Sequence, residues 1–186
     1  MNLLWDVDLS VTRAINGMAG QNGLLDIVMI WTSAAGIPLL VLAVASQWWI
    51  KPDRQATRHV LVAAGLSFIL GLAINQIILL FVDRVRPYAA GVSELLIAPS
   101  LDPSFPSDHA TAVFAIAATF ALHKMPKRAI WFALAALAVA ISRIYVGTHY
   151  ASDVLGGAVS GTIAAILILL LYQRGTRIDR FITNIL

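Results

Sequence analysis

Five long apolar stretches constrain how this chain can fold. Each is long and apolar enough to cross a bilayer as a helix, which takes roughly 20 residues. They cover approximately residues 24–47, 57–82, 107–123, 128–147 and 154–172, and the third is the shortest. We therefore expect an all-α integral membrane protein, built as a five-span helical bundle.

The composition agrees with this expectation. Of the 186 residues, 59% are hydrophobic and 12% are charged, so the chain cannot cover itself with the polar surface of a soluble domain. Around several spans, this length leaves room for a single membrane-embedded domain, residues 1–186, and for no separate soluble domain. The chain has no cysteine, which excludes disulfides, thiolate metal sites and cysteine nucleophiles.

Residues 1–19 have a different pattern from the spans. They alternate apolar side chains such as Trp5 with Asp6, Asp8 and Arg13, and they lack the basic start and long apolar core of a signal peptide. Such an amphipathic pattern favours a helix lying in the membrane interface, which would give six helices in all. A short first span and a frayed terminus are the alternatives that the pattern leaves open.

The basic residues predict the orientation. They concentrate in the connections after the first and third spans and after the fifth: Lys51, Arg54, Arg58, Lys124, Lys127, Arg128, Arg174, Arg177 and Arg180. Because cytoplasmic loops carry an excess of lysine and arginine, we expect these segments in the cytoplasm and the amino terminus outside. The chain would be a multi-pass protein of the bacterial inner or plasma membrane. Its net charge of +3 follows from topology and indicates no nucleic-acid partner.

Three polar segments reach the opposite, extracytoplasmic side if the spans alternate. They are DRVRPY after the second span, PSFPSDHA at the start of the third and SRIYVGTHYASD after the fourth. Ionisable residues at membrane depth are functional by default. Together the segments gather Arg84, Arg86, Ser107, Asp108, His109, Ser142, Arg143, His149 and Asp153.

These residue types suit phosphoryl transfer. Arginines present donors that match phosphate oxygens, and Ser107 stands where a helix N-terminus favours an anion. Two histidines allow one imidazole to attack and the other to protonate the leaving oxygen. Asp153 follows His149 by four residues, so we expect both on one helical face, with the carboxylate holding Nδ1–H and leaving Nε2 free. No spacing such as HExxH occurs, which disfavours a metal enzyme.

At these residues the chain resembles the type 2 phosphatidic acid phosphatases, which share a pocket with vanadium haloperoxidases. Their signature reads Lys-x6-Arg-Pro, then Pro-Ser-Gly-His, then Ser-Arg-x5-His-x3-Asp. The third part is matched in full and the others in part, by Arg86, Pro87, Pro106, Ser107, His109, Ser142, Arg143, His149 and Asp153. The resemblance extends from about the second span to the end.

Two positions depart from that signature. Leu79 stands where the family has its lysine, and Arg84 is the candidate substitute. Asp108 replaces the glycine; its backbone N–H can still donate to phosphate, while its carboxylate must point away from the dianion or pair with an arginine. The PSDHAT form, from Pro106 to Thr111, resembles the bacterial undecaprenyl-diphosphate phosphatases of the bacitracin-resistance type.

The resemblance implies a lipid phosphate or diphosphate substrate, most specifically undecaprenyl diphosphate, the carrier lipid of wall precursors. His149 would attack to give a phosphohistidine, and His109 would protonate the leaving group. Arg86, Ser107, Asp108, Arg143 and Arg84 would bind phosphate, and no metal or other cofactor is expected. Phosphatidylglycerol phosphate and phosphatidic acid are alternative substrates, and a non-catalytic lipid-phosphate binder or transporter is the alternative of another class.

Three features receive no catalytic assignment. Gly157 and Gly161 form a GxxxG, for which we expect packing within the chain rather than dimerisation. Asn75 and Gln76 lie within the second span, where interhelical hydrogen bonding is the default. The two remaining histidines, His59 and His123, fall in the predicted cytoplasmic turns.

Overall fold

The computed structural model describes residues 3–50 and 53–185, and within them every regular element is a helix. The all-α prediction is therefore confirmed. The elements are α1 (Leu3–Asn16), α2 (Gly23–Ala45), a short 3₁₀ turn η1 (Ser46–Trp49), α3 (Arg54–Leu79), α4 (Asp108–Leu122), α5 (Pro126–Tyr145), α6 (Ala151–Leu171) and α7 (Arg177–Thr183).

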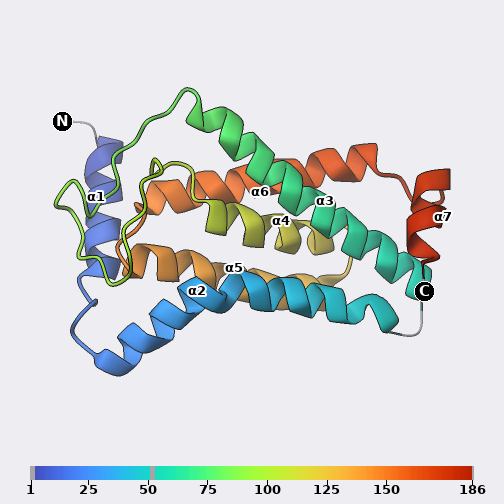
Figure 1. The fold of residues 1–186 in the computed structure, drawn as a ribbon, viewed down its shortest axis with the longest axis horizontal. Coiled ribbons are helices and arrows are strands. Elements are labelled where there is room, and N and C mark those ends of the chain that lie inside the picture. The colour runs from blue at the N-terminus through green and yellow to red at the C-terminus, as the bar shows by residue number, and fades with distance from the viewer. Residues whose placement is uncertain (1–2, 51–52, 186) are drawn as a thin grey trace.

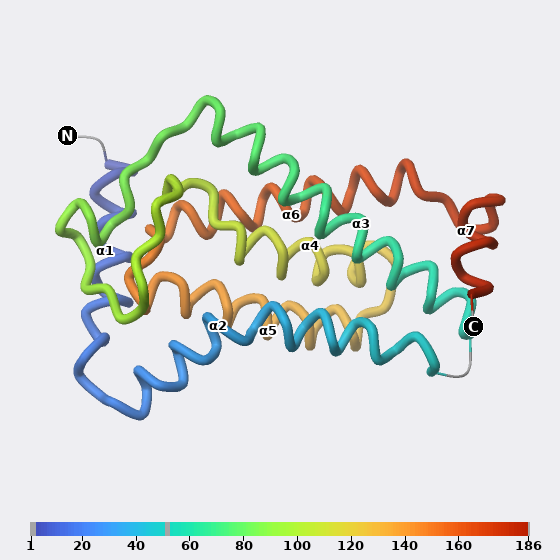
Figure 2. Tube along the Cα trace, in the orientation of Figure 1, coloured from blue at the N-terminus to red at the C-terminus, as the bar shows by residue number. Residues whose placement is uncertain are grey.

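The five longest helices run side by side, and α1 and α7 lie across opposite ends of the bundle (Figure 1). α4 occupies the centre, where it packs against α3, α5 and α6, while α2 packs mainly on α5. The long loop between α3 and α4 folds over the end that α1 covers, as the chain trace shows (Figure 2). Residues from three distant parts of the sequence therefore meet at that end.

Within the part of the chain that the structure describes, four helices are long and apolar enough to cross a membrane: α2 continued by η1, α3, α5 and α6. Their outward faces carry large apolar side chains, such as Leu42, Ile69 and Leu155, each more than 60% exposed. The chain is therefore a membrane protein. α4 has 15 residues, or about 22 Å at 1.5 Å per residue, so the five-span count stays a prediction.

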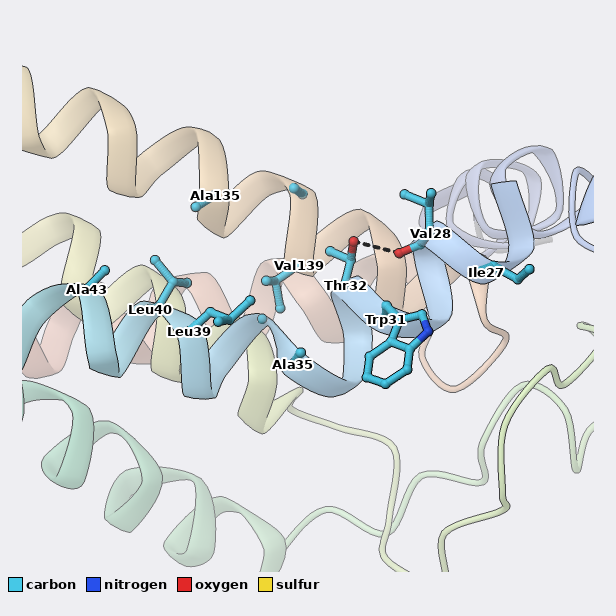
Figure 3. Close-up of a pocket in the computed structure, with 12 residues that line it drawn as sticks. Ile27, Val28, Trp31, Thr32, Ala35, Leu39, Leu40, Ala43, Ala135 and Val139 are labelled. Atoms are coloured by element: carbon cyan, nitrogen blue, oxygen red, sulfur yellow. Dashed lines mark hydrogen bonds between the residues drawn. The ribbon is translucent and has the colours of Figure 1, made fainter. Parts of the chain in front are cut away.

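An apolar groove of about 670 Å³ lies between α2 and α5 (Figure 3). Gly36 allows the two helices to approach, because a Cβ there would meet Val139 Cγ2 at 2.4 Å. Thr32, which lines the same groove, donates its hydroxyl to the Val28 carbonyl within α2, so the groove presents little polar surface. Such a lining suits contact with lipid.

α1 is amphipathic, but it buries its polar face instead of its apolar one. Its buried face is polar and consists of Asp8, Thr12 and Asn16, whereas apolar residues such as Leu3 and Leu4 are exposed. The polar face therefore contacts the end of the bundle, and the apolar face is left for another medium. The placement of this helix in the membrane interface remains a prediction.

The predicted total of six helices is wrong, because the structure describes seven α-helices. The addition is α7, where the Thr176 hydroxyl caps the first turn by accepting from the Asp179 N–H at 3.2 Å. Asp179 is held to the bundle by His59, whose Nδ1 lies 2.8 Å from its carboxylate. From the sequence alone, Arg177 and Arg180 of this segment indicated only the topology.

Gly157 and Gly161 pack α6 tightly against α4. A Cβ at Gly157 would lie 2.4 Å from the Ser107 carbonyl oxygen, and one at Gly161 would lie 2.4 Å from the Thr111 carbonyl oxygen. The expectation of packing within the chain is confirmed. This contact fixes the start of α4 beside the start of α6, and so determines how close the second and third motifs come.

Candidate active site

The three polar segments converge on one cavity of about 250 Å³ at the end of the bundle covered by α1. This is smaller than the pockets that hold drug-sized ligands, which suits a headgroup rather than a whole lipid. The lining residues are Gln76, Leu79, Arg86, Ser100, Asp102, Pro103, Pro106, Asp108, His109, Arg143 and His149.

His149 follows a tight turn that leaves α5. Gly147 has a φ of +83°, and a Cβ there would meet the Glu94 carbonyl oxygen at 2.0 Å, so the turn requires glycine. The His149 Nδ1 lies 2.8 Å from the Ser104 carbonyl oxygen, which only accepts, so Nδ1 carries the proton and Nε2 the lone pair. Nε2 lies 3.5 Å from Arg86 Nη1.

The electrostatic surroundings of His149 keep its imidazole neutral. Burial lowers the pKa of this ring, and the nearby Arg143 and Arg86 act in the same direction, while the neighbouring Asp153 carboxylate opposes the shift. A neutral ring with Nε2 unprotonated is the form that can act as a nucleophile.

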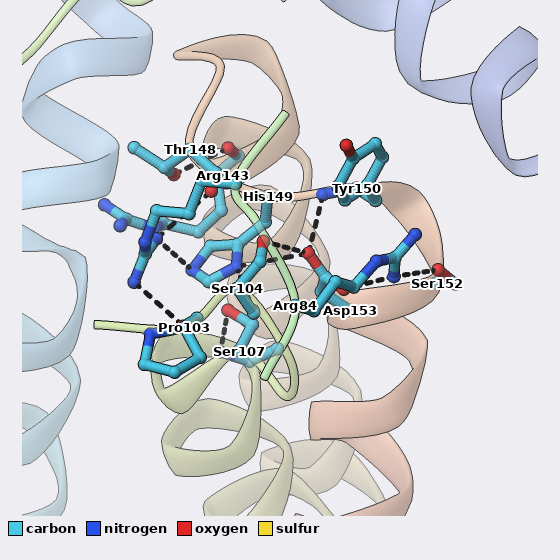
Figure 4. A network of polar contacts seen from close by, with 12 residues as sticks. Arg84, Pro103, Ser104, Ser107, Arg143, Thr148, His149, Tyr150, Ser152 and Asp153 are labelled. Atoms are coloured by element: carbon cyan, nitrogen blue, oxygen red, sulfur yellow. Dashed lines mark hydrogen bonds and ion pairs between the residues drawn. The ribbon is translucent and has the colours of Figure 1, made fainter. Parts of the chain in front are cut away.

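Asp153 supports His149 less directly than the spacing predicted. α6 begins at Ala151, so His149 precedes the helix, and its Nδ1 lies 3.5 Å from Asp153 Oδ2. That oxygen instead accepts from the Ser104 hydroxyl at 2.5 Å and from the Tyr150 N–H at 2.8 Å (Figure 4). Asp153 therefore caps α6 and fixes Ser104, whose carbonyl in turn orients the imidazole.

The two arginines of the cavity are held in different ways. Arg86 donates to three backbone carbonyls, at distances of 2.7 Å for Asp102, 3.1 Å for Thr148 and 3.3 Å for Pro103. Arg143 donates to the Ser33 hydroxyl of α2 at 2.5 Å, and its Nε is buried without a hydrogen-bond partner. A buried, unpaired donor beside a cavity is suited to an anionic ligand.

The start of α4 contributes the second motif. Ser107 is the N-cap of α4, and its backbone N–H donates to the Asp153 carbonyl at 3.0 Å, which joins the second and third motifs. His109 lies in the first turn and lines the cavity with His149. Ser142, by contrast, donates its hydroxyl to the Val139 carbonyl within α5.

Asp108 also lines the cavity, and its carboxylate is paired with an amide rather than with an arginine. Asn75 of α3 donates to its carboxylate at 2.7 Å and to the Thr111 hydroxyl at 2.8 Å. The interhelical hydrogen bonding expected for Asn75 is therefore confirmed. Leu79 lies in the cavity wall, so the position of the family's lysine presents an apolar side chain.

Arg84 is not brought to this cavity. Its guanidinium donates to Asp8 at 2.7 Å, to the Ser152 hydroxyl at 2.7 Å and to Asp153 at 2.5 Å. It lies on the side of Asp153 away from His149 (Figure 4). The phosphate-binding role predicted for Arg84 has no support in this arrangement. Asp8, which binds Arg84, and Ser104, which binds Asp153, were not predicted from the sequence.

Within residues 3–50 and 53–185, no three histidine, aspartate or glutamate side chains gather as a set of metal ligands. The cavity instead places two imidazoles and two guanidinium groups at the end of an apolar helical bundle. This is the arrangement of a membrane-bound phosphatase.

Comparison with known proteins agrees with this class. Residues 60–177 match the PAP2 superfamily, and the chain belongs to this superfamily of lipid phosphatases. It is 34% identical to undecaprenyl-diphosphatase BcrC of Bacillus subtilis, over 87% of this chain and 82% of that protein.

Two solved structures share the fold. The PAP2-type phosphatidylglycerolphosphate phosphatase of Bacillus subtilis superposes with a TM-score of 0.69 at 23% identity, over 95% of this chain and 90% of that chain. LpxE of Aquifex aeolicus gives a TM-score of 0.65 at 25% identity, over 87% of this chain and 94% of that chain. The helical bundle is therefore that of the PAP2 phosphatases.

Proposed function

We propose that this chain hydrolyses undecaprenyl diphosphate to undecaprenyl phosphate and inorganic phosphate through a phosphohistidine intermediate. The observation that carries the reaction is the His149 imidazole, whose Nδ1–H is committed to the Ser104 carbonyl while the ring lines a cavity with two arginines. The similarity to BcrC supports the choice of lipid.

In the first step, His149 Nε2 attacks the terminal phosphorus. The N–P bond forms as the bond between phosphorus and the bridging oxygen breaks, and the leaving undecaprenyl phosphate takes a proton from His109. The proton on His149 Nδ1 stays with the ring, hydrogen-bonded to Ser104, so the phosphorylated imidazole is cationic. Asp153, 3.5 Å from Nδ1, stabilises that charge.

In the second step, His109 accepts a proton from water, and the resulting nucleophile attacks the phosphohistidine. The N–P bond breaks, and inorganic phosphate leaves with His149 neutral again. Arg86, Arg143 and the first N–H groups of α4, capped by Ser107, stabilise the three phosphoryl oxygens in both transition states. Because these groups supply the positive charge, the proposed mechanism needs no metal ion.

The site would face outward from the bacterial inner or plasma membrane. In support, the cavity residues come from the end of the bundle that α1 covers. The start of α3, the turn between α4 and α5, and α7 lie toward the opposite end (Figure 1). The excess of basic residues predicts that these latter segments are cytoplasmic. An outward site would receive the carrier lipid diphosphate on the side where wall precursors are delivered.

Labelling in intact cells tests this orientation. The chain has no cysteine, so single replacements give clean reporters. Ala98→Cys, exposed in the α3–α4 loop, should react with a membrane-impermeant thiol reagent, whereas Lys127→Cys, exposed in the first turn of α5, should not. The reverse pattern would make the protein a cytoplasmic lipid phosphatase.

Competition between lipids tests the substrate. Purified protein in detergent should release phosphate from undecaprenyl diphosphate with a higher kcat/KM than from phosphatidylglycerol phosphate or phosphatidic acid. Preference for either glycerolipid would transfer the function to that substrate. Binding of all three without release of phosphate would identify a lipid-phosphate binder or transporter.

A further inference from the structure

Arg84 forms a closed polar network with α1 behind the catalytic histidine. One carboxylate partner is Asp153, and the other is Asp8 of α1. Asp8 also accepts from the Ser152 N–H at 2.8 Å and from the Ser152 hydroxyl at 2.5 Å. Since Arg84 donates to that same hydroxyl, two carboxylates, one guanidinium and one serine bind one another.

The network is buried enough for its charges to matter. Asp153 is fully buried and Asp8 is 8% exposed. The Arg84 guanidinium lies 3.9 Å from the centre of the Tyr150 ring and 5.4 Å from that of Trp5, which limits its contact with water. A buried carboxylate needs a paired cation to stay ionised, and in the described part of the chain Arg84 is the arginine that pairs with Asp153.

α1 contacts the His149 turn on both flanks. Its buried residues Asp8, Thr12 and Asn16 are spaced by four, so they lie on one helical face. Asn16 donates to the Tyr145 carbonyl at 2.8 Å, before the turn, and Thr12 accepts from the Ala151 N–H at 3.0 Å, after it. The helix thus fixes both ends of the turn that carries the imidazole.

We propose that Arg84 and Asp8 are positioning residues for His149, which they reach through Asp153, and that α1 is a part of the catalytic apparatus. Arg84 binds Asp153 Oδ1, which leaves Oδ2 to hold Ser104 and face the imidazole. Asp8 accepts a hydrogen bond from Nη2, the other terminal nitrogen of the Arg84 guanidinium. Without Asp8, Arg84 would pair with Asp153 alone and weaken the negative potential that stabilises the phosphorylated imidazole.

This inference deepens the proposed function and rests on it. Because Arg84 and Asp8 do not touch the cavity, their loss should lower kcat and leave the binding of phosphate unchanged. We expect Arg84→Gln to lower kcat by about 10- to 100-fold, the range found for residues that orient metal-bound histidines from behind. The inhibition constant of inorganic phosphate, measured as competitive product inhibition, should stay within about twofold of wild type.

Three companion variants separate positioning from folding. Arg84→Lys should recover part of the lost kcat, since a cation beside Asp153 is restored. Asp8→Asn should also lower kcat, and adding it to Arg84→Gln should cause no further loss, because Asp8 acts through Arg84. Asp6→Asn and Arg13→Gln, on the same helix outside the network, are the matched controls and should keep wild-type kcat.

The outcomes are distinguishable. A kcat for Arg84→Gln within about twofold of wild type, with His149→Ala inactive, would overturn this inference and leave the proposed function standing. A rise in the phosphate inhibition constant that accounts for the whole loss would return Arg84 to phosphate binding. Equal losses for Arg84→Gln and Arg84→Lys, each matched by a fall in Tm, would make the network purely structural. Full activity of His149→Ala would refute the proposed function itself.

Discussion

The two ends of the bundle each bury a histidine near an aspartate, yet only one end has the form of a catalytic site. At the end that α7 covers, the His59 Nδ1 lies 2.8 Å from the Asp179 carboxylate of α7. At the end that α1 covers, the His149 Nδ1 lies 2.8 Å from a carbonyl and 3.5 Å from Asp153. Judged by the histidine–aspartate distance alone, the His59–Asp179 pair would be the better candidate.

The difference lies in what surrounds each ring. The ring of His59 stacks on Tyr172 with centroids 4.7 Å apart and meets the edge of the His123 ring at 5.3 Å. The ring of His149 lines a cavity together with Arg86 and Arg143. A histidine–aspartate pair is therefore no catalytic signature by itself; a reactive nitrogen facing a cationic cavity is.

The carboxylate of the His59–Asp179 pair serves to dock α7. Burial alone would raise the pKa of Asp179, but hydrogen bonds from the Gly175 N–H, His59 and Tyr172 outweigh it and lower that pKa. The stabilisation from this carboxylate is therefore present above the ordinary pKa of an aspartate and is lost as the pH falls through the lowered value. At neutral pH α7 stays attached to the bundle.

Exchanging each histidine for alanine gives the largest expected contrast. His149→Ala should lower kcat on the order of 10⁴-fold or more, because it removes the nucleophile, as in other enzymes with a covalent intermediate. His59→Ala should keep kcat close to wild type and lower Tm. Phosphate release and thermal unfolding in detergent measure the two effects. Turnover by His149→Ala within about tenfold of wild type would remove its assigned role.

His109→Ala should cause the next largest loss, about 10²- to 10⁴-fold, the usual contribution of general acid–base catalysis. The loss should be smaller for a substrate with an activated leaving group such as p-nitrophenolate, which departs without a proton. Formation of the phosphohistidine, followed in a single turnover, isolates this step. Equal losses on both substrates would count against His109 as the general acid.

The sequence predicted most of the fold and the centre of the site. The apolar stretches located α2, α3, α5 and α6 within a few residues at each end, because a span in lipid must be apolar on most of its surface. The signature motifs located both histidines and both cavity arginines, because their spacing is local. The sequence did not predict which residues far apart in the chain contact one another.

The contacts that the sequence did not predict join residues that are far apart in the chain. Arg84 stands two residues from Arg86, yet its partner Asp8 is 76 residues away, and no spacing rule selects that carboxylate. Asn75 and Asp108 are 33 residues apart and meet only because α3 packs on α4. α7, with seven residues, is too short for its apolar period to be evident.

Replacing the aspartate of each pair by asparagine, in Asp153→Asn and Asp179→Asn, tests the same contrast through smaller expected effects. Asp153→Asn should lower kcat by about 10- to 100-fold, since Ser104 and the imidazole lose their anionic support. Asp179→Asn should leave kcat unchanged and lower Tm by about 2–12 °C, because a buried hydrogen-bonded partner is worth about 1–3 kcal/mol.

Limited trypsin digestion provides an independent measure for that pair. Asp179→Asn should expose Arg177 and Arg180 of α7 to cleavage, while Asp153→Asn should leave α7 as resistant as in the wild type. A loss of activity in Asp179→Asn, with Tm unchanged, would mean that the His59–Asp179 pair takes part in catalysis after all.

Removal of divalent metal ions should have the smallest effect, and it tests whether the two cavity arginines supply enough positive charge for the reaction. Arg86 is fixed by three carbonyls, and Arg143 has a buried N–H without a partner, so both are arranged before any phosphate arrives. EDTA should therefore leave kcat within about twofold of wild type, a barrier change below about 0.5 kcal/mol.

Orthovanadate should still inhibit in EDTA, since its trigonal-bipyramidal adduct needs only the imidazole and these donors. Moderate stimulation by Mg²⁺ would be compatible with this mechanism, because the cation also binds the free lipid diphosphate. Complete loss of activity in EDTA, restored by one divalent ion, would show that the protein's own cations are insufficient and would overturn the mechanism.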